Sequence, residues 1–365
     1  MEEDNFIWKI LSVVGISISG YCLKPYEKYL SYVIVTVCSF FLVYWIFVGL
    51  HLFLTGSITN VGFIVLIFMP IELSLFWYFL YVRKGSISLS TQQVYDYRNS
   101  YRRYTSQSHS LKLFVFALFL LPGALSLLRS VLDADEIKLW TFGYKVHNKI
   151  AVVMFTFYFT FMYYFCNTIV ILVTLSLSII FYRCREILIE YNNLLNIYLR
   201  QKRIRENIAF LKKFFNLIKI LQNLDQALSF ISFILIFYGL EMIFVVFMNL
   251  LVFKAEVHQI VYITDATFNF VNGFFIIIIY TLSSSFIPEK ITEIRKTAKD
   301  FIIEYNDRPL NFRNTIFYLK RIEKEDIVYI RAFGMFSISR QLILSAVGVT
   351  VTYGLLIINF NNSCK

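Results

Sequence analysis

The sequence predicts an all-α polytopic membrane protein with seven transmembrane helices. Hydrophobic residues make up 58% of its 365 residues and charged residues only 16%, whereas soluble domains carry about 25% charged residues. The mean hydropathy is +0.63, and a soluble fold of this size cannot hide that much apolar surface. The chain has only 5 prolines, so its apolar segments can form long unbroken helices.

Seven apolar segments are long enough to cross a hydrocarbon core about 30 Å thick. In chain order they cover residues 32–54, 58–82, 113–132, 150–182, 227–253, 260–287 and 342–360. The fourth carries no charge and would be about 50 Å long as a helix, so it has to tilt or project from the membrane. Residues 1–31 begin with acids and lack a basic stretch, so we expect a cytoplasmic segment rather than a signal peptide.

Lys and Arg residues are unevenly distributed between the two sides of the predicted membrane. The side that holds the N-terminus carries 27 of them, and the other side carries 6. Because basic residues favour the cytoplasmic side, we expect the N-terminus inside the cell and the C-terminus outside. A G-protein-coupled receptor also has seven spans, but in the opposite orientation.

Both long connections on the basic side are predicted to be helical, because their apolar residues recur at helical spacing. These residues are Leu211, Phe214, Phe215, Ile218 and Leu221 in one connection, and Ile291, Ile294, Ala298, Phe301 and Tyr305 in the other. Each apolar face needs a partner, which the same chain or a neighbouring subunit can supply.

The predicted organisation has seven parts in chain order. They are a cytoplasmic segment (1–31), transmembrane helices 1–4 (32–182), a cytoplasmic helical connection (183–226), transmembrane helices 5–6 (227–287), cytoplasmic helices (288–340), transmembrane helix 7 (341–360) and an extracellular tail (361–365).

Several function classes are disfavoured. The net charge of +11 is accounted for by the cytoplasmic connections, so we expect no nucleic-acid partner. The 5 cysteines are scattered, without metal-ligand spacing or a disulfide framework. The 4 histidines are unpaired, and no catalytic or phosphate-binding motif occurs. We therefore expect no enzyme activity, cofactor or metal, although an active site assembled from distant spans would escape a search for motifs.

Three acids fall within the predicted spans: Glu72, Glu241 and Asp265. Acids in such positions usually face the bundle interior or a water-filled cavity. Aromatic and polar residues gather in the outer halves of the fourth and sixth spans, which fits a small-molecule pocket. Its candidate residues are Tyr158, Phe161, Met162, Asp265, Phe268, Asn269 and Asn272. The alternative is that the aromatics pack or face lipid and that Asp265 sits at the membrane interface.

The last span carries one stripe of mostly small or polar residues. The stripe comprises Gln341, Ser345, Gly348, Thr352, Leu355 and Asn359, whose spacings of three and four residues place them on one helix face. Such a stripe lets helices approach closely and hydrogen-bond. It can equally line a water-filled path in a symmetric assembly.

The end of this span resembles the signature of the insect gustatory receptor family, which is kin to the insect odorant receptors. Thr352 and Tyr353 are followed by five mostly hydrophobic residues and then by Asn359 and Phe360. The family has Gln in place of Asn359, so the amide is kept but its reach is one methylene shorter. Residues 332–343 also resemble the family's segment before the last span. The resemblance extends to the whole chain in length, number of spans and inverted topology.

The resemblance implies a tetrameric, ligand-gated cation channel with a central pore lined by the last span. The cytoplasmic ends of the fourth to seventh helices would form a shared anchor, and the ligand pocket would lie among the outer halves of the second to sixth spans. Asn359 and Phe360 would lie near the extracellular gate, Leu355 and Leu356 in a hydrophobic constriction, and Thr352, Ser345 and Gln341 along the pore.

The same resemblance implies the partners and the location. We expect a small-molecule tastant, of a bitter type rather than a sugar, together with membrane lipid and monovalent and divalent cations as permeants. The tetramer would contain identical chains or other gustatory receptors, in the cell membrane of gustatory dendrites or axons. The alternatives are a metabotropic seven-helix chemoreceptor with inverted topology and a modulatory subunit of a heteromeric receptor. A transporter would predict internal repeats, and we find none.

Overall fold

The computed structural model describes residues 25–55, 60–99, 120–127, 149–200, 204–252, 259–305 and 313–363, and these are almost entirely helical. The elements are α2 (Pro25–Leu54), α3 (Asn60–Asn99), α6 (Lys149–Tyr163), the π-helix η1 (Tyr164–Thr168), α7 (Ile169–Arg200), α8 (Ile204–Val252), α9 (Gln259–Tyr305), α10 (Arg313–Lys324), β1 (Arg331–Ala332), β2 (Phe336–Ser337) and α11 (Gln341–Ser363). Residues 120–127 form a further short helical segment. The predicted helical fold class is confirmed.

Several helices are apolar enough to cross a membrane. Three candidate spans, Thr156–Arg200, Ile208–Phe247 and Ala266–Glu304, have the required length and composition within the described residues. Shorter apolar helical stretches occur at Val43–Leu54 and Gln341–Thr352. The span predicted at 113–132 lies outside the described residues except for 120–127.

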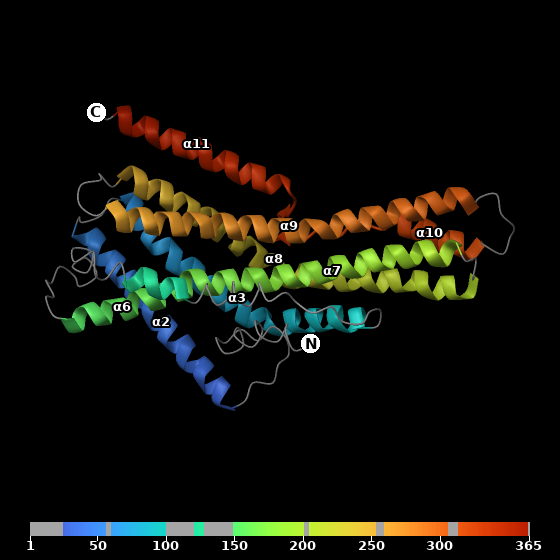
Figure 1. Ribbon diagram of the computed structural model, residues 1–365, viewed down its shortest axis with the longest axis horizontal. Helices are drawn as coiled ribbons and strands as arrows, with labels where there is room; N and C mark the ends of the chain where they lie inside the picture. The colour runs from blue at the N-terminus through green and yellow to red at the C-terminus, as the bar shows by residue number, and fades with distance from the viewer. Residues whose placement is uncertain are drawn as a thin grey trace.

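The helices form an elongated bundle in which α7, α8 and α9 run most of its length (Figure 1). At one end α10 packs against α8 and α9. At the other end α2, α3 and α6 join the bundle, while α11 leaves its middle and diverges from α9 toward the C-terminus (Figure 1). The pore-helix candidate is therefore only loosely enclosed by the bundle.

The helices at the α10 end continue well beyond the predicted apolar spans. The segments predicted as 150–182 and 260–287 extend as α7 to Arg200 and as α9 to Tyr305. The amphipathic faces account for this continuation, because each has a partner within the same chain. Leu211, Phe214, Ile218 and Leu221 are buried on α8, and Ile291, Ile294, Ala298 and Phe301 are buried on α9.

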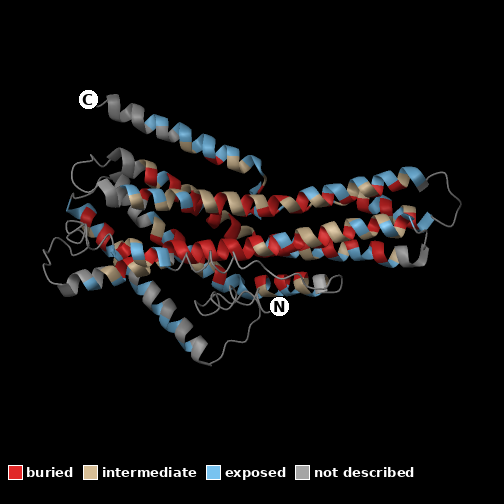
Figure 2. Ribbon diagram, in the orientation of Figure 1, coloured by how far each residue is buried: buried red, intermediate tan, exposed pale blue. Residues whose placement is uncertain are grey.

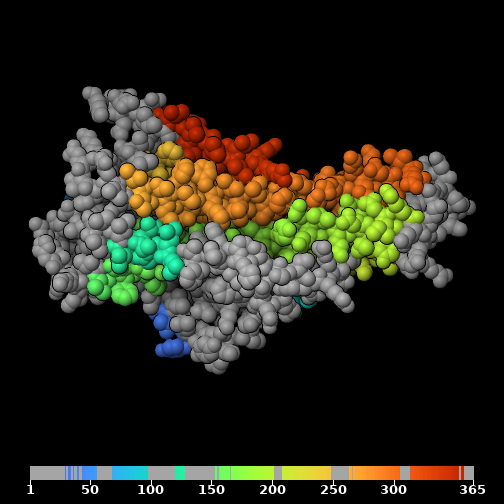
Figure 3. Space-filling view, viewed as in Figure 1, coloured from blue at the N-terminus to red at the C-terminus, as the bar shows by residue number. Residues whose placement is uncertain are grey.

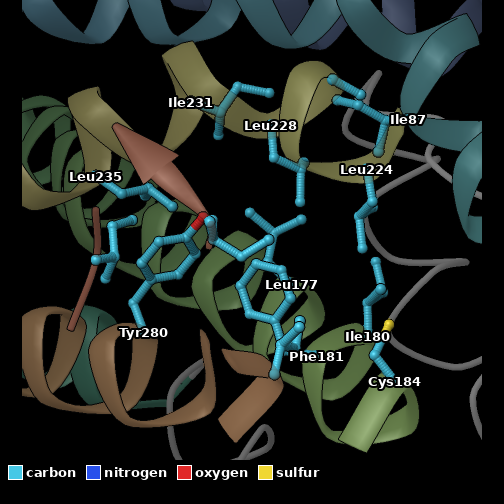
Figure 4. Close-up of a cluster of buried hydrophobic side chains, with 14 of the residues drawn as sticks. Ile87, Leu177, Ile180, Phe181, Cys184, Leu224, Leu228, Ile231, Leu235 and Tyr280 are labelled. Atoms are coloured by element: carbon cyan, nitrogen blue, oxygen red, sulfur yellow. The ribbon is translucent and has the colours of Figure 1, made fainter. Parts of the chain in front are cut away.

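The core is centred on α7, which is buried on all sides over Ile169–Ser178 (Figure 2). A helix that is apolar all round occupies the middle of a bundle. Figure 4 shows Leu177 and Phe181 of α7 meeting Leu228 of α8 and Tyr280 of α9. The Tyr280 hydroxyl lies 2.5 Å from the Ser232 hydroxyl, so this buried polar group is satisfied.

Two glycines allow α8 and α9 to approach closely. A Cβ atom added at Gly273 would lie 2.7 Å from the Gly239 carbonyl oxygen, and one added at Gly239 would lie 2.8 Å from Cγ1 of Ile277. Small residues at a helix crossing are a common device in membrane bundles. The helix backbones therefore touch at a point where larger residues would hold them apart.

A short β-hairpin, which the sequence pattern did not predict, precedes α11. Arg331 pairs with Ser337 and Ala332 with Phe336 in antiparallel register. At its turn, Phe333 and Gly334 adopt left-handed backbone conformations, with φ of 53° and 68°. Glycine accepts this conformation readily and Phe does not. The Phe333 amide compensates by donating to the Ser229 carbonyl at 2.8 Å.

Candidate ligand pocket and pore helix

Two carboxyl groups from different helices meet inside the apolar part of the bundle. Glu72 belongs to α3 and Glu241 to α8, and their carboxyl groups lie close enough to interact with each other. Glu72 is only 5% exposed, and Glu241 is partly buried. The sequence predicts that acids within the spans face the bundle interior, and for these two the prediction is confirmed.

Most of the hydrogen-bonding capacity of this pair is unused. Apart from the contact between the two carboxyl groups, no donor in the described part of the chain reaches either carboxyl oxygen of Glu72 or Oε2 of Glu241. Leaving a buried polar atom without a partner costs about 1–3 kcal/mol. Acids kept within a membrane at such a cost usually serve a function.

A narrow enclosed void borders Glu72. Its other lining residues are Leu73, Phe76, Val170, Ile234, Leu235 and Tyr238. Apart from the acid and the Tyr238 hydroxyl, the side chains around the void are hydrocarbon. A few polar groups within a mostly apolar and aromatic lining are typical of small-molecule sites.

The Tyr238 hydroxyl connects this region to the π-helix η1. It donates to the Cys166 carbonyl oxygen at 2.6 Å, and Tyr238 lies one helical turn before Glu241 on α8. The next residue of η1, Asn167, is buried, and its Oδ1 has no partner among the described residues. Single π-turns are frequent at functional sites, because they leave part of the helix hydrogen-bonding ladder irregular.

The structure brings only some of the predicted pocket residues together. Phe268 of α9 meets α6 through Tyr163, with ring centroids 5.9 Å apart. Tyr158 lies toward α2, where its ring packs edge-to-face with Tyr44 at 5.7 Å. Phe161 and Met162 are partly buried against the core.

The polar candidates on α9 differ in burial. Asn272 is buried, and its Nδ2 has no acceptor in the described part of the chain. Asn269 is half-buried. Asp265 belongs to α9, but its side chain lies outside the described residues. The Asn272 amide thus adds a further polar group to the bundle interior.

The predicted stripe on α11 faces away from the chain's own helices. Its described members are exposed, and they are Gln341, Ser345, Gly348, Thr352 and Leu355. Leu356, from the predicted constriction, is also exposed. The side chains of Tyr353, Asn359 and Phe360 lie outside the described residues. In the space-filling view α11 lies along the outer surface of α9 (Figure 3), so one copy of the chain leaves the stripe uncovered.

The opposite face of α11 is attached to the bundle through Ala346. This residue is buried in a small cluster with Ile243 of α8 and Ile277 of α9. Ile243 lies two residues after Glu241. A single stretch of α8 therefore contacts both the carboxyl pair and the candidate pore helix.

Sequence reasoning missed the partners of this stretch. It singled out Glu72 and Glu241 separately but gave no sign that they meet, because their contact joins residues far apart in the chain. It also overlooked Tyr238, although Tyr238 and Glu241 are three residues apart and share a helix face. That spacing is the signal that could have identified the second polar residue of the site.

Taken together, the long apolar helices, the interior acids and the loosely attached last helix define a multi-pass helical membrane protein. No protein-family model matches the sequence, and no curated protein matches it. Solved structures do match its fold. The insect olfactory receptor OR5 from Machilis hrabei aligns over 97% of this chain and 96% of that chain, with a TM-score of 0.69 and 11% sequence identity.

The same receptor in complex with eugenol aligns over 98% of both chains, with a TM-score of 0.67 and 12% identity. The alignment covers nearly the whole chain, so the likeness is not confined to one part of the bundle. The chain therefore has a fold similar to that of this olfactory receptor.

Proposed function

We propose that this chain is an insect chemoreceptor of the gustatory type, a non-selective cation channel opened by a small-molecule tastant. The observation that carries the proposal is the uncovered small and polar stripe on α11. Four copies arranged around an axis would turn this stripe toward a central path. The fold likeness to an olfactory receptor and the Thr352–Phe360 motif support the same assignment.

The gate in this proposal is the outer part of α11. Leu355 and Leu356 form a hydrophobic constriction, and Asn359 and Phe360 lie at its outer end. A ring of apolar side chains closes a pore by excluding water, and it conducts when the ring widens. Ser345, Thr352 and Gln341 then line the wetted part of the path for monovalent and divalent cations.

Opening requires a ligand that binds the open arrangement more tightly than the closed one. The contact of α8 with both the carboxyl pair and Ala346 supports a direct route between pocket and pore. A tastant that repositions α8 near Glu241 also repositions Ile243, on which α11 rests. The pocket lining is mostly apolar, which favours bitter-type compounds over sugars, because sugars need many polar partners.

Whole-cell recording tests the pore assignment. Asn359→Ala and Leu356→Ala should change conductance, ion selectivity or basal leak in cells that express the chain. Exposed residues on α2, such as Phe47, supply a control position away from the pore. Currents like those of the parent from both α11 variants would contradict the assignment.

Two further measurements separate this proposal from the alternatives. A C-terminal epitope tag should be labelled on intact cells, because the proposal places the C-terminus outside. Expression of the chain alone, with calcium imaging against a panel of tastants, distinguishes a self-sufficient channel from a modulatory subunit. A subunit of the second kind would respond only when another receptor is co-expressed.

A further inference from the structure

In the part of the chain that the structure describes, the interior acids Glu72 and Glu241 have no counter-charge. We propose that this pair binds an organic ammonium group, so that the chain recognises a basic amine or a quaternary ammonium compound. The inference deepens the proposed function, on which it rests for the expectation that binding opens a channel. Binding itself is measurable without any current.

Within the described residues, no positively charged side chain pairs with either acid. The ion pairs of the described residues join Arg183 with Glu186, Lys290 with Glu293, Arg331 with Asp225 and Arg340 with Glu289. None of them involves Glu72 or Glu241. A carboxylate withdrawn from water without a partner is strongly disfavoured. A cation from outside the chain would therefore find unsatisfied oxygen atoms on two helices at once.

The surroundings favour an organic cation over a metal ion. Calcium takes about six to eight oxygen ligands, whereas the void beside Glu72 is lined by aliphatic side chains and by Phe76 and Tyr238. The Tyr238 hydroxyl already donates to Cys166. An ammonium group needs few oxygens, its carbon substituents tolerate apolar walls, and aromatic rings attract it.

The two acids lie at a similar depth on two neighbouring helices. Glu72 is twelve residues from the first residue of α3, and Glu241 is eleven from the last residue of α8. At about 1.5 Å per residue, both acids lie about 17 Å from these helix ends. That is roughly half the thickness of a hydrocarbon core, so the ligand enters deep into the bundle.

Binding has to separate the two acids, because the void between the helices is narrow. Any proton held on these carboxyl groups leaves to solvent when the ammonium group takes its place. The cation then lies between α3 and α8, beside Glu241. On α8, Glu241 is three residues from Tyr238 and two from Ile243. Ammonium binding thus acts on the part of α8 that supports α11.

A thermal-shift titration of the purified full-length protein tests binding directly. The probe is a phenylpropyl trimethylammonium ion, and its control is the uncharged analogue with a tert-butyl group in place of trimethylammonium. The ion should raise the melting temperature, and the analogue should not. Equal shifts from both compounds would overturn the proposal.

Matched variants identify the site. Glu72→Gln and Glu241→Gln keep the side-chain shape and a polar end group, but each removes a carboxyl group that can carry charge. Each should weaken binding of the ion at least about tenfold, since charges in apolar sites interact strongly. Asp96→Asn, at an exposed position of the same helix α3, should retain parent affinity. Parent affinity in both Gln variants would overturn the assignment.

Two arms distinguish failure of this inference from failure of the proposed function. Charge-dependent binding without current in cells would leave the ammonium site standing and count against the channel. Currents evoked by the neutral analogue alone would support the channel and count against the ammonium site. If sodium or calcium stabilises the protein in a Glu72-dependent way and the ammonium ion does not, the site binds inorganic cations and the proposal is wrong. If neither Gln variant folds, the comparison of ion and analogue on the parent decides.

Discussion

Asp225 on α8 holds Arg331 of strand β1 through three hydrogen bonds. Its carboxylate accepts from the Arg331 backbone amide at 2.7 Å, and from Nε and Nη2 of the guanidinium group at 2.9 and 2.7 Å. One turn further along α8, Ser229 accepts from the amides of Phe333 and Gly334 at 2.8 and 3.0 Å. Helix α8 therefore fixes the hairpin from which α11 departs.

Replacing Asp225 with Asn should lower the stability of the protein by about 1–3 kcal/mol. Asn keeps the size of the side chain but loses the charge that faces the guanidinium group. A fully buried pair would cost more, but the Arg331 side chain is 58% exposed, so solvent screens part of the interaction. The measurement is the melting temperature of the purified protein.

The control for that substitution is Glu289→Gln. Glu289 pairs with Arg340, and both side chains are largely exposed, so the expected loss is about 0–1 kcal/mol. Equal shifts in melting temperature for the two variants would mean that Asp225 is not a principal attachment of the hairpin.

Replacing Gly273 with Ala should force α8 and α9 apart. The new methyl group would lie 2.7 Å from a backbone oxygen of α8, which cannot rotate away, and 2.9 Å from Cγ1 of Ile243. We expect a loss of about 1–3 kcal/mol, measured by thermal denaturation in detergent. The matched control is Gly85→Ala on α3, where nothing lies within 4 Å of the added atom. A larger loss at Gly85 than at Gly273 would contradict the close approach.

The sequence alone predicted the helical class and the amphipathic faces because both depend on local periodicity. Leu211, Phe214, Ile291 and Ile294 recur at helical spacing and are all buried within the chain. Periodicity could not say whether those faces pack within one chain or between chains. The helices continue beyond the apolar spans, which agrees with the helical spacing in the connections that follow those spans.

Contacts between distant segments lay beyond the reach of sequence patterns. Nothing in the sequence around Glu72 indicates that Glu241 is its neighbour, and nothing around Asp225 indicates Arg331. The hairpin was missed because its strands are only two residues long and because a Phe occupies a left-handed position in its turn. Its backbone is held there by Ser229, a residue that lies more than a hundred positions earlier in the chain.

Enlarging Ala346 to Leu should raise the basal current. Ala346 is 5% exposed and packs against Ile243 and Ile277, where a small side chain lets α11 lie close to α8 and α9. Overpacking a contact displaces the helices that form it. If the closed pore depends on this attachment, current without ligand should increase several-fold relative to the parent, at equal surface expression.

The control for Ala346 is a substitution on the exposed side of the same helix. Leu344 is 76% exposed, so Leu344→Ala should leave the basal current close to that of the parent. Parent-like basal current in Ala346→Leu would show that this attachment does not set the closed state.

A water-soluble, charged thiol reagent should modify cysteines placed along the α11 stripe. Ser345 and Thr352 are exposed on the stripe, and the Thr352 hydroxyl only bonds back to the Gly348 carbonyl at 2.8 Å, so Ser345→Cys and Thr352→Cys should preserve the fold. If the stripe meets water in the assembled pore, the reagent should reduce ligand-evoked current in both variants, beyond any effect on the parent. Val347 is exposed but lies well off the stripe, so Val347→Cys should resist the charged reagent. Modification at Val347 but not at Ser345 or Thr352 would indicate that the stripe packs against helices and does not line the ion path.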